Sequence, residues 1–320
     1  MKLVFGIMSA VQSAATVTQL AQSLTPHQVV IHHDRQQQPD FSVPLPHVQF
    51  VADPKRTGWG VWAFSEGIFH LMRHCVEHVD FDYFQLLSPT CLPIKPMSVF
   101  HDELAKDQVD ANIDTIDLSA DSDALMNFGH RAFAPVDSLR FRLLKRCFLH
   151  YYGYEWGSQK RSNLQLRVVS SDSRGPAAHL CHLLTRMAQR GWLGGHLYVD
   201  RYRPLAGGTW FGARREVCQF LLNAFDDAQV SGFFSRVHIA DELMIATLLG
   251  NSQYRIGPSN HLVNDFTAGN PNWLNMNDIQ MLKGSERFFA RKFPDDPAAS
   301  VRQAMLTHVG RTRSVSSKVA

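Results

Sequence analysis

The chain opens with Met1-Lys2-Leu3-Val4-Phe5-Gly6-Ile7-Met8, and this apolar segment sets the fold class. The run from Leu3 to Ile7 contains no polar side chain, which is typical of a strand that is covered on both faces. The run is much shorter than a membrane span, and polar residues follow it from Ser9 onward, which also argues against a signal peptide. We therefore predict that this stretch forms the first buried strand of a sheet.

Strand-like and helix-like patterns alternate through the first third of the chain. Apolar residues recur at helical spacing up to Pro26, which cannot continue a helix, and again from Phe64 to Val79. The alternation predicts helices over 13–24 and 64–79 and strands over 28–32, 47–51 and 83–87. This order, with short connections, predicts an α/β protein with a mostly parallel central sheet flanked by helices. Such sheets bind ligands at the carboxyl ends of their strands.

The patterns are weaker in the rest of the chain. The region 115–175 is polar and less periodic, and we predict helices around 136–152 and a variable loop there. A sharp turn into a strand is expected at Gly207-Gly208-Thr209-Trp210-Phe211. We further expect a return to the sheet at 197–199, helices over 214–225 and 241–249, and a flexible polar tail over 312–320.

The composition limits the classes of function. The chain has 320 residues, of which 45% are hydrophobic and 19% are charged, so it can bury a large core and is not a disordered protein. A net charge of +3 is too small to indicate nucleic-acid binding. The five cysteines are widely spaced, without zinc spacing, which favours reduced thiols in the cytoplasm. Because no G-x-G-x-x-G or Walker motif occurs, a dinucleotide-dependent dehydrogenase and a P-loop kinase are disfavoured.

Three acidic or histidine segments have residue types that bind metals. Asp80-Phe81-Asp82 precedes the strand at 83–87 and so lies at the wrong edge of the sheet, while Asp121-Ser122-Asp123 follows no strand. A helix-to-strand turn and a solvated loop are the simpler interpretations of these triplets. His32-His33-Asp34 does end a strand at the correct edge. This segment could bind a metal, cap a turn, or accept hydrogen bonds from a base or ribose through Asp34.

Two further segments carry side chains suited to one kind of reaction. Asp241 is a good N-cap for an apolar helix, and the helix dipole would keep Glu242 ionised in its first turn, as a general base requires. Arg291 and Lys292 stand between aromatic residues and could hold a departing anion. The simpler interpretations are a helix cap and a solvated charge pair. A base together with fixed cations suits the transfer of a sugar from a nucleotide sugar, and Trp210 could stack on that sugar.

Five segments follow one another in an order that has a known counterpart. Residues 81–95, Phe-Asp-Tyr-Phe-Gln-Leu-Leu-Ser-Pro-Thr-Cys-Leu-Pro-Ile-Lys, resemble the motif FDYxxLLSGxDYPIK. The others are Trp59-Gly60-Val61-Trp62 for WGGF, Gly207-Gly208-Thr209-Trp210-Phe211 for GGSxWW, Ala240-Asp241-Glu242 for SPDE, and Phe289-Ala290-Arg291-Lys292-Phe293 for FARKF. From about residue 3 to residue 293 the chain thus resembles the core-2/I-branching family of glycosyltransferases, which includes branching β-1,6-N-acetylglucosaminyltransferases and peptide O-xylosyltransferases.

The resemblance implies a GT-A-like nucleotide-binding fold. It implies a single domain over 1–311, with a nucleotide-binding half at about 1–110 and an acceptor and catalytic half at about 111–311. It also implies an inverting transferase that needs no metal and no cofactor, with UDP-N-acetylglucosamine as the expected donor and a glycan or glycolipid as the acceptor. The implied roles are a general base at Glu242, UDP-sugar contacts at Asp34, Arg291, Lys292, Ser9 and Trp59, and acceptor contacts at Asp114, Trp210 and Asp241.

Three positions depart from the family motifs. Pro89 replaces a glycine and Cys91 replaces an aspartate. A second diphosphate-binding arginine of some members falls near Leu262, so Arg291 or another cation would have to substitute for it. The cysteine pattern and membrane anchor of secretory members are absent, which points to a bacterial relative in the cytoplasm, at most peripherally attached to the inner face of the membrane. No nucleic-acid partner is expected.

Two alternative functions stay open at this point. One is a transferase of xylose or another sugar that uses a metal ion at His33 and Asp34. The other is a non-catalytic nucleotide- or sugar-binding protein of a polysaccharide assembly complex. The basic C-terminal residues Arg311, Arg313 and Lys318 could touch anionic lipid, but we expect a solvated terminus.

Overall fold

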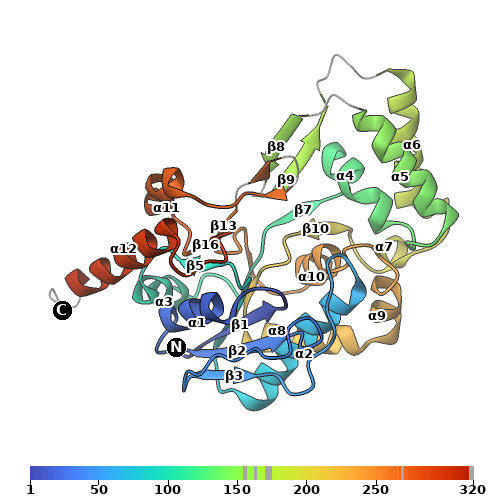
Figure 1. The fold of residues 1–320 in the computed structure, drawn as a ribbon. Coiled ribbons are helices and arrows are strands. Elements are labelled where there is room, and N and C mark those ends of the chain that lie inside the picture. The colour runs from blue at the N-terminus through green and yellow to red at the C-terminus, as the bar shows by residue number, and fades with distance from the viewer. Residues whose placement is uncertain (154–156, 162–163, 170–174, 265, 268–269, 317–320) are drawn as a thin grey trace.

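The fold is built on a seven-stranded sheet (Figure 1). The computed structural model describes residues 1–153, 157–161, 164–169, 175–264, 266–267 and 270–316. The strand order is β12 (Ile256–Gly257), β6 (Ala111–Asn112), β11 (Gly212–Arg214), β4 (Tyr83–Leu87), β1 (Leu3–Ser9), β2 (Gln28–His33) and β3 (Val48–Phe50). Neighbouring strands are parallel except at β11, which is antiparallel to both β6 and β4. The predicted α/β class, with a mostly parallel central sheet flanked by helices, is confirmed.

The other strands form four small sheets. They pair as β13 (Leu262–Asn264), β16 (Phe289–Arg291) and β5 (Leu92–Pro93); β10 (Leu205–Gly207) and β7 (Thr115–Asp117); β14 (Phe266–Thr267) and β15 (Asn270–Pro271); and β8 (Gly157–Arg161) and β9 (Leu164–Val168). The helices are α1 (Ala14–Ser23), α2 (Trp62–His78), α3 (Met97–Ala105), α4 (Ser122–Ala132), α5 (Leu139–Tyr152), α6 (Pro176–Gln189), α7 (Leu197–Asp200), α8 (Arg215–Asp226), α9 (Ala228–Phe234), α10 (Asp241–Gly250), α11 (Ile279–Gly284) and α12 (Ser300–Ser316), with a 3-10 turn, η2 (Met276–Asp278).

Both faces of the central sheet are covered, which explains the apolar run that opens the chain. All seven residues of β1 are buried. On one face, α2 and α8 pack on the sheet so closely that a Cβ atom at Gly6 would lie 2.9 Å from Leu71 of α2. On the other face, the Phe5 ring lies 6.3 Å from Phe100 of α3 and 5.8 Å from Phe289 of β16, measured between centroids. The predicted first strand is confirmed, and it extends to Ser9.

Helices α4, α5 and α6 pack on one another and form what we call the helical lobe (Figure 1). The lobe buries its own small apolar cluster of Met126, Cys147, Tyr151, Tyr152, Ala178 and Cys181. The described part of 115–175 is therefore mostly regular structure, and the helix expected around 136–152 is α5, which begins at Leu139. Helix α4 is buried on most of its surface.

Two expectations for the second half need correction or completion. Residues 197–199 do not return to the sheet but form the short helix α7, because the buried Tyr198 ring packs edge-on against Phe133 and Phe233. Three apolar residues have no period that separates a strand from a helix. Helix α12 includes 312–316, the start of the expected flexible tail, and 317–320 lie outside the described residues. Within the described ranges, none of the helices combines the length and apolar composition that a membrane crossing requires.

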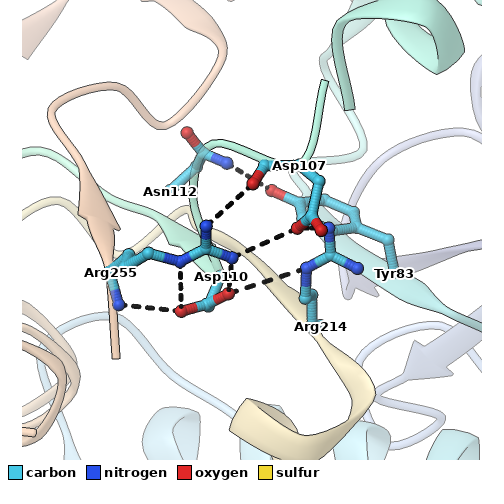
Figure 2. Close-up of polar contacts among 6 residues, drawn as sticks. All are labelled: Tyr83, Asp107, Asp110, Asn112, Arg214 and Arg255. Carbon is cyan, nitrogen blue, oxygen red and sulfur yellow. Dashed lines mark hydrogen bonds and ion pairs between the residues drawn. The ribbon is translucent and has the colours of Figure 1, made fainter. Parts of the chain in front are cut away.

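The amino edge of the sheet is closed by an ion network (Figure 2). Arg255 donates to Asp110 Oδ1 at 2.6 Å and to Asp107 Oδ1 at 3.1 Å, and Arg214 also donates to Asp107 at 2.6 Å. The hydrogen bonds from Arg255 lower the pKa of Asp110 below its usual value. The Asp80-Phe81-Asp82 triplet lies just before β4 at the same edge, where both carboxylates contact Lys2. The charged groups at this edge thus pair with one another. Ligands of α/β sheets bind at the opposite edge, where the parallel strands end.

Candidate functional site

The carboxyl ends of β1 and β2 meet at the opposite edge of the sheet. The parallel register places His33 beside Ser9, and the backbone N–H of Asp34 donates to the Ser9 carbonyl at 3.0 Å. The Ser9 hydroxyl lies 3.1 Å from His33 Nδ1, and Ser9 is only 3% exposed. Ser9 therefore links the carboxyl ends of β1 and β2 and contacts both His33 and Asp34.

Asp34 organises the loop that continues from β2. Its carboxylate accepts hydrogen bonds from the Thr57 backbone N–H at 2.8 Å, the Thr57 hydroxyl at 3.2 Å, Gln37 Nε2 at 2.9 Å and the Gln36 N–H at 3.1 Å. Burial tends to raise the pKa of Asp34, but these hydrogen bonds outweigh burial and lower it. Asp34 is thus an ionised carboxylate already engaged by protein donors, and a nucleoside would have to share or displace them.

The loop between β3 and α2, in which Thr57 donates to Asp34, carries Trp59 to the surface. Trp59 is 83% exposed, and its ring centroid lies 6.2 Å from that of His238. The carbonyl of Gly60 accepts a hydrogen bond from the Ile239 N–H at 3.2 Å. The loop between β3 and α2 therefore contacts the segment that leads into α10. An exposed indole ring at this place offers a flat apolar face to a ligand.

Helix α10 starts at Asp241, and the prediction that Asp241 is its N-cap is wrong. Ala240 is the N-cap and already has helical dihedral angles, φ −62° and ψ −31°, so the helix begins one residue earlier than expected. Asp241 instead accepts a hydrogen bond from the Thr209 hydroxyl at 2.5 Å. Its other oxygen, Oδ1, is buried without a hydrogen-bond partner among the described residues. Glu242 lies in the first turn, as predicted.

Asp241 titrates abnormally because of its surroundings. Burial, followed by the neighbouring charge of Glu242, raises the pKa of Asp241 to about 6. The folded state therefore holds this proton more tightly than the unfolded state, whose carboxyl has a pKa near 3.8. The stabilisation is fully present below about pH 4 and is lost as pH rises through about 6.

The Asp241→Asn variant tests this assignment. The amide keeps an acceptor for Thr209 but carries no charge, so the variant should be more stable than the native protein by about 1 to 3 kcal/mol at pH 7 to 8. The difference should shrink as pH falls toward 4, measured by urea unfolding at a series of pH values. Asp102→Asn, which alters a carboxylate whose side chain is 80% exposed, is the control and should show no such dependence. Parallel stability curves for native protein and Asp241→Asn would contradict the assignment.

Glu242 forms an ion pair that sequence reasoning missed. Arg131 Nη2, from α4, donates to Glu242 Oε2 at 2.6 Å. The Arg131 side chain is 9% exposed, whereas that of Glu242 is 34% exposed. Arg131 Nη1 is buried and has no hydrogen-bond partner within the described ranges. The guanidinium thus fixes one carboxylate oxygen, while the rest of the Glu242 side chain stays accessible.

Arg291 contacts an aromatic ring and lies within charge-interaction range of Glu242. Its guanidinium carbon lies 5.0 Å from the Trp210 ring centroid, a cation–π contact. Burial lowers the pKa of Arg291, and the charge of Glu242 acts in the opposite direction, so the two charges lie within interacting range. Trp210 is 9% exposed and offers little open surface to a sugar in this structure. Arg291 Nε is buried without a described partner, and Arg291 is therefore not the solvated cation of the simpler interpretation.

Lys292 directly follows β16 and lies near a second exposed indole ring. Lys292 Nζ lies 5.0 Å from the ring centroid of Trp273, which is 53% exposed. Burial, and then the charge of Arg291, lower the pKa of Lys292. The N–H of Phe293 donates to the Thr90 carbonyl at 2.9 Å, which ties this strand to the loop after β4. Both cations of the segment are thus fixed near the carboxyl edge of the sheet.

Asp114 and Arg287 add a second charged pair to the region. Asp114 is 1% exposed, and its Oδ1 lies 3.9 Å from Arg287 Nη1. The Asp114 carbonyl accepts a hydrogen bond from Gly208 at 3.1 Å, and a Cβ atom at Gly207 would lie 2.5 Å from the same carbonyl, which requires glycine there. Leu262 is buried and supplies no cation, but Arg287 lines a cavity of about 350 Å³ with it. Sequence reasoning did not single out Arg287.

His33, which precedes Asp34, already makes contacts with other protein groups. Its Nε2 lies 2.8 Å from the Gln38 carbonyl, its Nδ1 contacts Ser9, and the ring stacks on Phe41 with 3.8 Å between centroids. Burial lowers the pKa of His33. Across the described ranges, His, Cys, Asp and Glu form no group of three or more that could hold a metal ion. A metal at His33 and Asp34 would have to replace existing hydrogen bonds of both side chains.

We compared the chain with family models and with curated proteins. The chain matches no family model. It also matches no curated protein. The functional argument therefore rests on the residues described above: the acidic pair at the start of α10, the buried Arg131, the partly buried Arg291 and Lys292, and the carboxyl strand ends with Asp34.

Proposed function

We propose that the protein is an inverting, metal-independent glycosyltransferase with a GT-A-like fold, which moves a sugar from a UDP-sugar to a hydroxyl group of a carbohydrate acceptor. N-acetylglucosamine is the sugar that we propose first, on the strength of the motif resemblance. The observation that carries the proposal is the proximity of Glu242 and Arg291. The Glu242 side chain is 34% exposed and lies within charge-interaction range of the partly buried Arg291. Lys292 follows Arg291 in the chain.

In the proposed reaction, Glu242 takes the proton of the acceptor hydroxyl. The acceptor oxygen forms a bond to the anomeric carbon as the bond from that carbon to the UDP oxygen breaks on the opposite side. Lys292 and Arg291 offset the negative charge that develops on UDP. Their desolvated surroundings strengthen this interaction relative to water, because a lower effective dielectric constant increases charge attraction.

Arg131 acts as a positioning residue in this proposal. Its hydrogen bond holds Glu242 Oε2 and fixes the direction of the carboxylate, which supports proton transfer through the other oxygen. Asp241 accepts a hydrogen bond from Thr209 through Oδ2, and in this proposal its Oδ1 accepts a hydrogen bond from a hydroxyl group of the acceptor. Trp59, the most exposed aromatic of the region, offers a stacking surface for the donor.

A thermal-shift screen of nucleotides and nucleotide sugars tests the donor assignment. Ligand that binds only the folded state, at 100 times its Kd, adds about 2.7 kcal/mol of stability. We expect a rise in Tm with UDP or one UDP-sugar that is unchanged by EDTA, and a smaller rise in the Lys292→Met variant. A rise that requires Mg²⁺ or Mn²⁺ would favour a metal-dependent transferase, and a rise without turnover would favour a non-catalytic binding protein. No rise with any nucleotide would overturn the proposal.

A further inference from the structure

Positive charge is concentrated in one stretch of the chain. Residues 138–199 contain ten Lys and Arg but only two Asp and Glu, a net charge of +8. Since the whole chain has a net charge of +3, the remaining residues together carry −5. The mild overall charge therefore hides a strong asymmetry, and the basic stretch coincides with α5, α6 and the segments that flank them.

The outer face of α5 combines this charge with uncovered leucines. Phe141, Leu144 and Cys147 are buried toward the rest of the lobe. The exposed positions are Leu139, Arg142, Leu143, Lys145, Arg146, Leu149 and His150. The three leucines among them are 76%, 41% and 54% exposed, and the helix contains no acidic residue. Every exposed side chain of α5 is thus a leucine, a lysine, an arginine or a histidine.

Helix α6 and the loop after it also expose apolar side chains. Leu180 and Leu183 are 56% and 54% exposed, and Trp192, just beyond the helix, is 72% exposed. The Arg140 side chain packs against Gly194, which brings the start of α5 next to the loop that carries Trp192. Figure 1 shows α5 and α6 side by side at the outer edge of the molecule, away from the central sheet. We call the exposed residues of these two helices, with Trp192, the lobe surface.

We propose that the lobe surface docks on an anionic lipid bilayer. Single exposed leucines are ordinary, but five of them with a tryptophan among basic side chains form the pattern of a membrane-interface element. The lysines and arginines would meet anionic head groups, while the leucines and Trp192 enter the boundary with the acyl chains. A nucleic acid would attract the same charges but gains little from aliphatic leucines, which favours the bilayer.

Docking at this surface would also orient the candidate site. The inner helix of the lobe, α4, carries Arg131, which contacts Glu242. The site and the lobe surface are therefore joined by one packed unit of helices, and a lipid-borne acceptor would reach the site from the bilayer. The docking proposal itself does not rest on the proposed function, because the charge and the exposed leucines are independent of any chemistry at Glu242.

Vesicle co-sedimentation tests the proposal with the full chain. We expect binding to phosphatidylcholine vesicles that contain one third phosphatidylglycerol, weaker binding at high salt, and little binding to pure phosphatidylcholine. The triple variant Arg142→Gln, Lys145→Gln, Arg146→Gln should bind about 100-fold more weakly, at about 1 kcal/mol per cation. The triple variant Leu139→Ser, Leu143→Ser, Leu149→Ser should bind at least about tenfold more weakly, because the leucines lose burial in lipid.

Matched variants separate the lobe surface from charge in general. Lys2→Gln, Lys106→Gln, Lys283→Gln removes three exposed cations outside the lobe and should bind like the native protein. Arg311→Gln, Arg313→Gln, Lys318→Gln removes three cations near the C-terminus and should also bind normally. The proposal would be overturned if all three charge variants lost vesicle binding equally, or if only the C-terminal variant lost it. Full vesicle binding by the leucine variant would also overturn it. The last result, together with binding to RNA, would point to a polyanion instead. Circular dichroism and an unchanged Tm verify folding.

Discussion

The Glu242→Gln variant is expected to lose at least about 100-fold in kcat for sugar transfer while it keeps its affinity for the UDP-sugar. Glutamine has the shape of the native side chain but cannot take a proton from the acceptor hydroxyl. It also keeps an oxygen that can accept the hydrogen bond from Arg131, so the local structure should survive. The measurement is steady-state release of UDP with a saturating acceptor, alongside the thermal shift with UDP.

The control for this variant is Glu216→Gln on the exposed face of α8. It makes the same chemical change away from α10 and should leave both turnover and binding unchanged. A Glu242→Gln protein that binds UDP and turns over at the native rate would exclude Glu242 as the base. A protein that loses UDP binding as well would instead assign Glu242 to donor recognition, through its charge near Arg291.

The second large effect concerns Arg302, which is fully buried in α12. Its guanidinium donates to Gln19 Oε1 at 2.6 Å, to the Pro294 carbonyl at 3.1 Å and to the Thr16 carbonyl at 3.4 Å. Arg302→Met fills a similar volume but leaves these three acceptors without their donor. We expect the free energy of unfolding to fall by about 3 kcal/mol, at about 1 kcal/mol for each hydrogen bond from the guanidinium that is lost. Urea unfolding at pH 7 measures it.

The same variant should also weaken the candidate site. Pro294 lies just after Arg291 and Lys292 in the chain, and Arg302 anchors its carbonyl. We therefore expect a smaller thermal shift with UDP in Arg302→Met than in the native protein. Arg236→Met, at an exposed position, controls for the loss of one arginine and should change neither quantity. Native stability in Arg302→Met would mean that the apolar replacement compensates for the lost hydrogen bonds, as can happen when burial of a charge is itself costly.

Local patterns were sufficient for the parallel part of the fold. The strands expected over 28–32, 47–51 and 83–87 correspond to β2, β3 and β4, and the helix over 64–79 corresponds to α2. A strand buried on both faces must be apolar throughout, and a helix on such a sheet must be apolar along one side, so both leave a readable period. The same logic placed Asp34 at a strand end and Glu242 in the first turn of a helix.

Errors arose where packing replaced periodicity as the deciding factor. The short helix α7 forms because a single buried tyrosine anchors it, and three residues are too few to show a period. Asp241 was expected to cap α10, but Thr209, which is distant in sequence, offers its hydroxyl to the carboxylate. Capping is a local preference, and a tertiary hydrogen bond overrode it.

Local sequence patterns were enough to assign the α/β class, the buried first strand and the separate positions of the acidic pair and of Arg291-Lys292, because each depends on neighbours within a few residues. Which charged side chains contact one another became clear only from the folded chain. Arg131 reaches Glu242 across 111 positions of the chain, and Arg291 of β16 makes a cation–π contact with Trp210, which lies between β10 and β11. The concentration of leucines and cations on the outer face of α5 and α6 likewise became visible only once the buried faces were known. Contacts between distant segments depend on how helices and strands pack, which no short window of sequence records.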